Sequence, residues 1–168
     1  MIQGGKNMAK IITAPKEYYG LYSSRWPSLF LAGGITGCED WQVQMLEKLK
    51  HETLIIYNPR RENFPIDDPS AAEVQICWEF DKLVRADIVS FWFSAGSLNP
   101  IVLYELGLHG NSMPGRPIAV GVEEKYSRKM DVYYQTALAR PEVRIVTSLE
   151  DLAEEIRAIL RVMTGQSK

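Results

Sequence analysis

The amino-acid sequence predicts an α/β fold, built as a doubly wound five-stranded parallel sheet in a flavodoxin-like or Rossmann-like three-layer sandwich. Two observations predict this class. Short apolar segments alternate five times with longer segments whose apolar residues have helical spacing. The first apolar segment, SLFLAG at residues 28–33, is apolar at almost every position, which is typical of a strand buried on both faces of a parallel sheet. Such alternation covers both faces of the sheet with helices.

Each expected element has a recognisable pattern. Residues 53–57 (TLIIY) are rich in β-branched side chains, and residues 39–52 place Trp41, Met45 and Leu49 at helical spacing. Strands are expected over residues 28–33, 53–57, 87–93, 117–122 and 143–147. Helices are expected over residues 39–52, 70–85, 100–109, 128–139 and 148–161.

Polar residues mark the starts of three of these helices. Ser70, with Glu73 three residues later, is expected to form a capping box at the start of the second helix. Asn99 before Pro100 predicts an N-cap that is followed by proline at the first helical position. Ser148 is expected to begin the amphipathic closing helix.

The chain is expected to hold one domain, at residues 28–163. Residues 1–27 contain scattered apolar positions and two prolines, so we expect an irregular arm there, with one short strand at residues 10–13. The last residues, 164–168, are polar and are expected to form a disordered tail.

The composition excludes several function classes. Of the 168 residues, 46% are hydrophobic and 24% are charged, and the net charge is −2. This balance argues against binding to polymeric nucleic acid, which needs clustered Lys and Arg. No apolar run approaches the roughly 20 residues of a membrane helix, and the start lacks the pattern of a signal peptide, so a cytoplasmic protein is expected. The two cysteines and two histidines form no recognisable zinc motif, so we expect no metal and no cofactor.

Three segments follow strands at the edge where open parallel sheets bind ligands, beyond the carboxyl ends of the strands. These segments are residues 33–37, 94–99 and 123–131. The first has the sequence GGITG, and the backbone N–H groups of Gly33, Gly34, Ile35 and Thr36 are candidates for holding a sugar or a phosphate. The turn matches neither the dinucleotide-binding nor the P-loop fingerprint, so a tight strand-to-helix turn is the alternative.

Two glutamates, Glu79 and Glu105, stand in apolar helical patterns. The apolar residues that share a helix face with one of them are Ile76, Leu83, Ile101 and Leu108. A carboxylate on an apolar face is costly unless it is paired or functional. Two such carboxylates at one crevice would suit acid–base or glycosyl chemistry. The alternative is that each one borders a buried stripe and reaches water or an arginine such as Arg85.

Other side chains are weaker candidates. Trp92, near the end of the third expected strand, is a candidate for stacking on a planar base, and core packing is the alternative. The hydroxyls of Thr36, Ser94 and Ser97 would suit a phosphate. His109, near the end of its helix, is placed to interact with the helix dipole, and this competes with a catalytic role.

Four segments occur in a fixed order along the chain and together resemble a known family. They are LFLAGGITG at residues 29–37, CWEFDKLVRADIVSFWF at 77–93, NPIVLYELGLHG at 99–110 and RKMDVYYQ at 128–135. They resemble the nucleoside 2-deoxyribosyltransferase family, and most of all its branch of nucleoside 2-deoxyribosyltransferase-like proteins. The resemblance covers about residues 28–160 and implies a flavodoxin-like fold.

The resemblance implies roles for five residues. In the family, the glutamate of the ELG segment attacks the anomeric carbon, and this residue is Glu105 here. Glu79 takes the place of an acidic residue, aspartate in better-known members, that positions or protonates the base. Asn99 replaces an acidic residue that binds a sugar hydroxyl, and Phe30 replaces a tyrosine beside the nucleophile. Asp131 lies in a segment that reaches the neighbouring subunit's site, which implies a homo-oligomer with shared sites.

The function implied by the resemblance is retaining N-glycosyl transfer on small-molecule nucleosides or nucleotides. A 2-deoxyribosyl group would move between nucleobases through a covalent ester with Glu105. The first alternative is hydrolysis of the N-glycosidic bond of a nucleoside or its 5′-monophosphate. The second is non-catalytic binding of a nucleotide or an ADP-ribose-type ligand, because Asn99 and Phe30 depart from the family's pattern.

Overall fold

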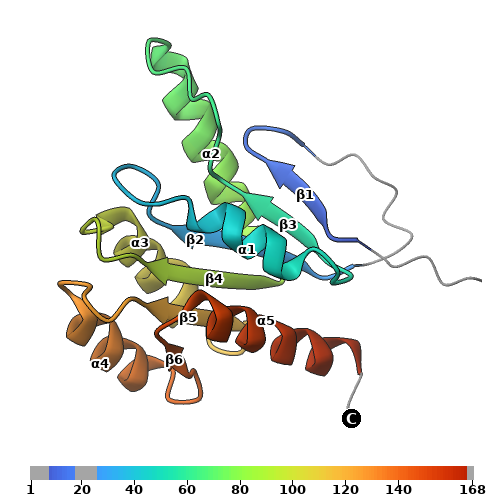
Figure 1. The fold of residues 1–168 in the computed structure, drawn as a ribbon, viewed down its shortest axis with the longest axis vertical. Helices are drawn as coiled ribbons and strands as arrows, with labels where there is room; N and C mark the ends of the chain where they lie inside the picture. Colours follow the sequence, from blue (N-terminus) through green and yellow to red (C-terminus); the bar gives the residue numbers. More distant parts are fainter. Residues whose placement is uncertain (1–7, 18–25, 166–168) are drawn as a thin grey trace, which may run out of the picture.

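The structure is a computed structural model that describes residues 8–17 and 26–165. Its centre is a parallel sheet of six strands in the order β1-β3-β2-β4-β5-β6 (Figure 1). The strands are β1 (Lys10–Thr13), β2 (Ser28–Gly33), β3 (Ile55–Asn58), β4 (Ile88–Phe93), β5 (Ile118–Val122) and β6 (Ile145–Val146). Without β1, the order is the 2-1-3-4-5 order of flavodoxin-like folds, so the predicted fold class is confirmed.

The prediction of five strands is wrong by one, because the segment at residues 10–13 joins the sheet. Its register pairs Lys10 with Ile55 and Thr13 with Asn58, which makes β1 the edge strand beside β3. The side chain of Ile12 is buried in the core, and this burial holds the short strand in place. The rest of the expected irregular arm, residues 1–7 and 18–25, and the end of the expected tail, residues 166–168, lie outside the described residues. The division into arm, domain and tail stays a prediction.

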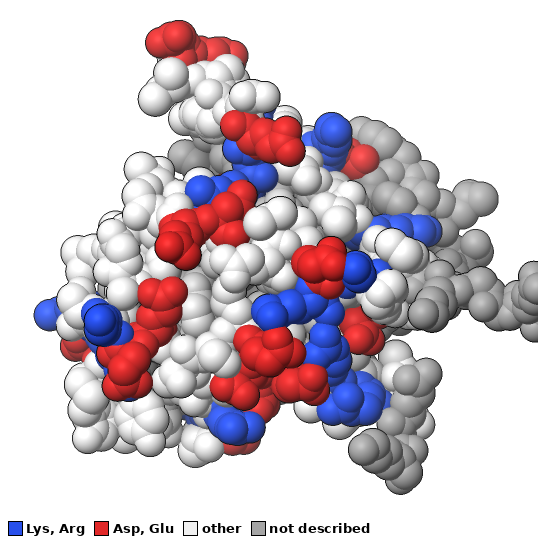
Figure 2. All heavy atoms as spheres, viewed as in Figure 1, with Lys and Arg blue, Asp and Glu red and all other residues white. Residues whose placement is uncertain are grey.

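Helices cover both faces of the sheet and complete the predicted three layers. One face carries α1 (Trp41–Leu49) and α5 (Leu149–Thr164), which lie side by side (Figure 1). The other face carries α2 (Pro69–Arg85), α3 (Pro100–Glu105), the π-helix η1 (Leu106–Asn111) and α4 (Lys129–Ala139). Figure 2 shows acidic and basic side chains intermingled over the α1/α5 face, where Arg157 pairs with Glu52 at 3.1 Å.

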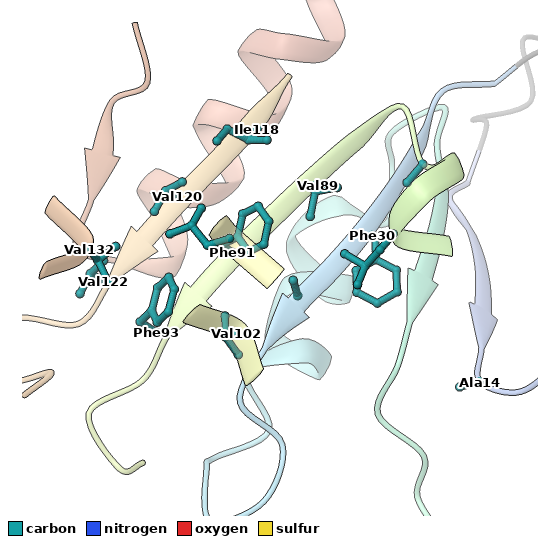
Figure 3. Packing of buried hydrophobic residues seen from close by; sticks show 14 of the residues in the cluster. Ala14, Phe30, Val89, Phe91, Phe93, Val102, Ile118, Val120, Val122 and Val132 are labelled. Atoms are coloured by element: carbon teal, nitrogen blue, oxygen red, sulfur yellow. The ribbon is translucent and has the colours of Figure 1, made fainter. Parts of the chain in front are cut away.

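Strand β4 divides its side chains between two cores. Phe91 and Phe93 pack on the α2/α3/α4 side with Val102 of α3, as Figure 3 shows, whereas Trp92 packs on the α1/α5 side. Successive side chains of a strand point to opposite faces, so the two cores follow directly from the sequence IVSFWF. No helix in the described part of the chain is long and apolar enough to cross a membrane.

The helix ends differ from expectation in three places. The N-cap of α2 is Asp68, whose carboxylate accepts hydrogen bonds from the backbone N–H and the hydroxyl of Ser70, so the prediction of Ser70 as the cap is wrong. Asn99 occupies the N-cap position of α3 but makes no side-chain capping bond. The helix expected to end near His109 changes to π geometry after Glu105 and continues to residue 111. Ser148 stands at the start of α5, where the closing helix was expected to begin, and caps it by accepting from the N–H of Asp151.

Candidate active site

A cavity of about 330 Å³ opens at the carboxyl edge of the sheet, on the α2/α3 side. It lies beside the neighbouring strands β2 and β4, whose connections lead to helices on opposite faces of the sheet. This is the switch point, where the fold class predicts a ligand. Nine residues predicted for the site line it: Phe30, Gly33, Gly34, Ile35, Thr36, Glu79, Ser97, Asn99 and Glu105. The structure therefore brings together most of the expected residues, from β2, α2, α3 and two turns.

The two predicted glutamates face the same cavity from different helices. Glu105 is the last residue of α3 and is only 9% exposed, and Glu79 lies on α2 and is half-buried. Three of the four apolar residues expected beside them, Ile76, Ile101 and Leu108, are exposed. The change to π geometry after Glu105 alters the helical spacing, which places Leu108 away from the buried side.

Burial controls the protonation of this pair. Burial raises the pKa of Glu105 to about 8, and the charge of Glu79 adds to the rise. Burial also raises the pKa of Glu79, and a hydrogen bond from Gln75 acts against that rise. Among the described residues, nothing donates a hydrogen bond to Glu105. Glu105 therefore keeps its proton at neutral pH in the free protein, and Glu79 is the first of the pair to ionise.

Gln75 holds Glu79 in place, and the sequence analysis missed it. The buried amide of Gln75 donates to Oε1 of Glu79 and to the carbonyl of Pro59, both at 2.7 Å. The spacing of four residues on one helix was the signal that could have revealed this pair. The idea that Glu79 pairs with Arg85 is wrong, since Arg85 forms its ion pair with Asp81.

The glycine turn after β2 is packed tightly against the loop that follows β4. A Cβ added at Gly34 would lie 2.0 Å from Oδ1 of Asn99 and 2.5 Å from Sγ of Cys38, so only glycine fits there. The amide of Asn99 donates to the carbonyls of Ser94 and Ser97, both at 3.0 Å, and its backbone has a positive φ of 49°. Asn99 thus fixes the shape of its own loop while it lines the cavity.

Three residues predicted for the site lie elsewhere. Trp92 and Ser94, the candidates for base stacking and for a phosphate contact, point to the α1/α5 side and line a second cavity. Strand alternation is the reason: Phe30 is opposite Val89, and Trp92 is three residues further along β4. Asp131 is exposed on α4, where it pairs with Arg128, and it lines neither cavity.

The first cavity is mainly apolar, and among the described residues the only ionisable groups that line it are the two glutamates. Phe30 forms part of its wall, with its ring 6.2 Å from that of Trp78. The lining residues that were not predicted for the site are Ala32, Pro59, Pro100, Ile101 and Val102. In residues 8–17 and 26–165, no three His, Cys, Asp or Glu side chains are grouped so that they could hold a metal ion. His109 is buried with its ring against Phe80, outside the cavity.

The fold and this cavity define a flavodoxin-like α/β protein with a buried pair of carboxyl groups at the switch point of its sheet. A family model described as "Nucleoside 2-deoxyribosyltransferase like" matches residues 26–126, which is more than half of the chain and includes both glutamates. The chain belongs to this nucleoside 2-deoxyribosyltransferase-like family. Asp131 lies beyond the matched residues.

Solved structures that share the fold include that of a conserved protein from Enterococcus faecalis V583. The two chains are 20% identical, with a TM-score of 0.57, and the match covers 79% of this chain and 98% of the other. None of the curated proteins matches this chain. At this identity, the similarity concerns the fold alone.

Proposed function

We propose that this protein catalyses retaining N-glycosyl transfer on nucleosides and moves a 2-deoxyribosyl group from one nucleobase to another. The observation that carries the proposal is the pair Glu79 and Glu105, which share one largely apolar cavity in which the pKa of each is raised. Such a pair can divide the roles of nucleophile and proton donor. Membership in the family supports the same chemistry.

The proposed reaction proceeds in two steps. The Glu105 carboxylate attacks the anomeric carbon while the N-glycosidic bond breaks, and Glu79 gives its proton to the departing base. A nitrogen of the second base then attacks the glycosyl–Glu105 ester, and Glu79 takes back a proton from that base. Both steps pass through a positively charged, oxocarbenium-like sugar, which the two carboxyl groups stabilise.

The protonation state of the two glutamates in the free protein determines what must happen before the first step. Glu105 holds a proton and Glu79 is the first of the two to ionise, so the proton must move from Glu105 to Glu79 before the attack. The Gln75 amide keeps Glu79 oriented for this exchange. Positive charge that develops on the sugar favours an ionised Glu105, because opposite charges attract strongly in a dry cavity.

An uncharged nucleoside suits the cavity better than its 5′-monophosphate. The lining contains two acidic side chains and no basic one among the described residues. Hydroxyls at Thr36 and Ser97, and N–H groups of the turn from Gly33, are available to sugar hydroxyls. A phosphate dianion would be repelled by whichever glutamate is ionised.

Product analysis tests the function directly. Incubation with a deoxynucleoside and a different free base is expected to give the exchanged nucleoside, detected by chromatography. For the 5′-monophosphate, kcat/KM is expected to be lower by about tenfold or more, because an ionised glutamate repels the phosphate. Free sugar in place of the new nucleoside would identify a hydrolase. Binding by calorimetry without any product would identify a non-catalytic nucleotide-binding protein.

We also propose that the protein is a homo-oligomer in which α4 meets a neighbouring subunit. Asp131, Tyr134 and Leu138 lie on one face of α4 at spacings of three and four residues. Leu138 is 81% exposed and Tyr134 is 58% exposed, which leaves an apolar face uncovered beside the exposed Asp131 carboxylate. In this arrangement Asp131 would bind a sugar hydroxyl in the neighbour's cavity.

Light scattering after gel filtration tests this assembly. Leu138→Glu is expected to yield a smaller species with reduced activity, because it puts a charge into the apolar contact. Val162→Glu is the matched control, since Val162 is 82% exposed on α5, which covers the opposite face of the sheet. Its size and activity should equal those of the wild type. A wild-type protein that is monomeric at assay concentrations would contradict the proposal.

A further inference from the structure

A second cavity, of about 480 Å³, opens at the carboxyl edge of the sheet on the α1/α5 side. Its walls come from α1, the loop before it, the turns after β4 and β5, and the start of α5. We propose that this cavity binds a small uncharged molecule that carries a hydrogen-bond acceptor beside hydroxyl or amino donors, such as a free sugar or a free nucleobase. This site is separate from the one that holds the glutamate pair.

Two buried polar groups at this cavity have no hydrogen-bond partner among the described residues. They are the indole N–H of Trp92 and the hydroxyl of Ser94, on residues that are 2% and 5% exposed. Buried polar groups in folded proteins are nearly always paired, because an unpaired one costs about 1–3 kcal/mol. Two such groups at one cavity therefore indicate a ligand that supplies an acceptor to the indole.

The strand geometry places these two groups together. Trp92 is in β4, and Ser94 follows two residues later, so both point to the α1/α5 side. Ser90, two residues before Trp92, has the same orientation, but its hydroxyl already donates to the carbonyl of Phe30. On this face of β4 and the residue that follows it, the unpaired groups thus lie at the end of the strand, where the cavity begins.

The turns separate this cavity from the first one. A Cβ at Gly96 would lie 3.2 Å from the carbonyl oxygen of Gly37, so the turn after β2 and the turn after β4 are nearly in contact. The two cavities have no lining residue in common. A ligand in the second cavity would therefore not occupy the reaction site.

Charge on the walls selects the ligand class. Three lining carboxylates, on Glu39, Glu123 and Glu150, accompany one lining ammonium group, on Lys48, which is already paired with Glu150. The start of α5 is also acidic, which offsets the attraction of its N-terminus for anions. Anions are disfavoured, and hydroxyl or amino donors find acceptors on the carboxylates.

The indole N–H signals of the protein in NMR spectra provide the test. The chain has four tryptophans, and the Trp92 signal is assigned as the one lost in Trp92→Phe. Titration with adenine or with 2-deoxyribose is expected to shift the Trp92 signal, and the probe that does so tells whether the site takes a base or a sugar. Inorganic phosphate is expected to cause no shift.

Two serine variants make the test specific. Ser94→Ala should weaken the binding about five- to tenfold, as expected for one lost hydrogen bond. It should not lower the melting temperature, because it removes an unpaired group. Ser90→Ala, the matched control, should leave the binding unchanged, and so should Glu105→Gln. The proposal is overturned if neither probe shifts Trp92, if phosphate alone does, if Ser94→Ala binds like the wild type, or if Glu105→Gln abolishes binding.

Discussion

Replacing Glu105 by Gln is expected to lower the rate of base release from deoxynucleosides by on the order of 10³-fold or more. The amide has nearly the same shape as the carboxyl group, so the cavity keeps its form. It cannot form the glycosyl ester, since an amide oxygen is a poor nucleophile. The measurement is kcat/KM for release of free base, followed by chromatography.

The matched control for this variant is Glu73→Gln. Glu73 lies on the exposed side of α2, so Glu73→Gln makes the same substitution outside the cavity. It should leave kcat/KM within about twofold of the wild type, as expected for a surface substitution. Undiminished turnover by Glu105→Gln would remove Glu105 from the mechanism.

Stability provides an independent measurement on the same variant. The pKa of Glu105 is about 8 in the folded protein and near its usual 4.5 when unfolded, so the folded state binds the extra proton between these pH values. The protonated Glu105 carboxyl group makes its full contribution to the free energy of unfolding below pH 4.5. This contribution is lost as the pH rises through 8. Glu105→Gln has no such loss. Its stability relative to the wild type should therefore increase by about 3 kcal/mol from pH 5 to pH 8.

Chemical denaturation at the two pH values checks this prediction. The difference in stability between Glu105→Gln and the wild type must be compared at both pH values. Burial of the glutamine amide has a cost of its own, but this cost is the same at every pH. Glu73→Gln should follow the wild type at both pH values, because it is a substitution at an exposed surface position. A constant difference between Glu105→Gln and the wild type would mean that Glu105 ionises as it does in water.

The sequence predicted most of the sheet because each central strand is short and apolar. Residues 28–33 and 88–93 are buried on both faces, and such segments have few alternative structures. The edge strand β1 was foreseen as a strand, but its place in the sheet depends on pairing with β3, which lies more than 40 residues away. Long-range pairing of this kind is not contained in a local pattern.

The site was predicted in its position but not in its details. The glycine turn and both glutamates were found from their place after strands and on apolar helices, and the structure brings them to one cavity. Gln75 was not predicted, because a spacing of four residues on a helix brings many pairs close without showing which of them form a hydrogen bond. Trp92 and Ser94 lie at a second cavity, and strand alternation already separates Trp92 from Phe91 and Phe93.

Replacing Glu79 by Gln is expected to reduce kcat/KM for ordinary deoxynucleosides by about 10²- to 10⁴-fold, the usual contribution of a positioned proton donor. The loss depends on the base that leaves. A base that departs easily as an anion needs no proton, so a substrate with such a base should lose less than about tenfold. Rates for the two substrates with wild type, Glu79→Gln and Glu73→Gln give the comparison.

The dependence on the leaving base separates proton donation from mere binding. A residue that only holds the base would affect both substrates equally, because its contact does not depend on the charge that the base acquires. Glu79→Gln keeps the side-chain volume and the ability to accept a hydrogen bond, and the Gln75 amide can still donate to it. Equal losses for both substrates would therefore make Glu79 a binding group, and the proton for the departing base would have to come from Glu105, whose pKa of about 8 leaves it protonated in the free protein.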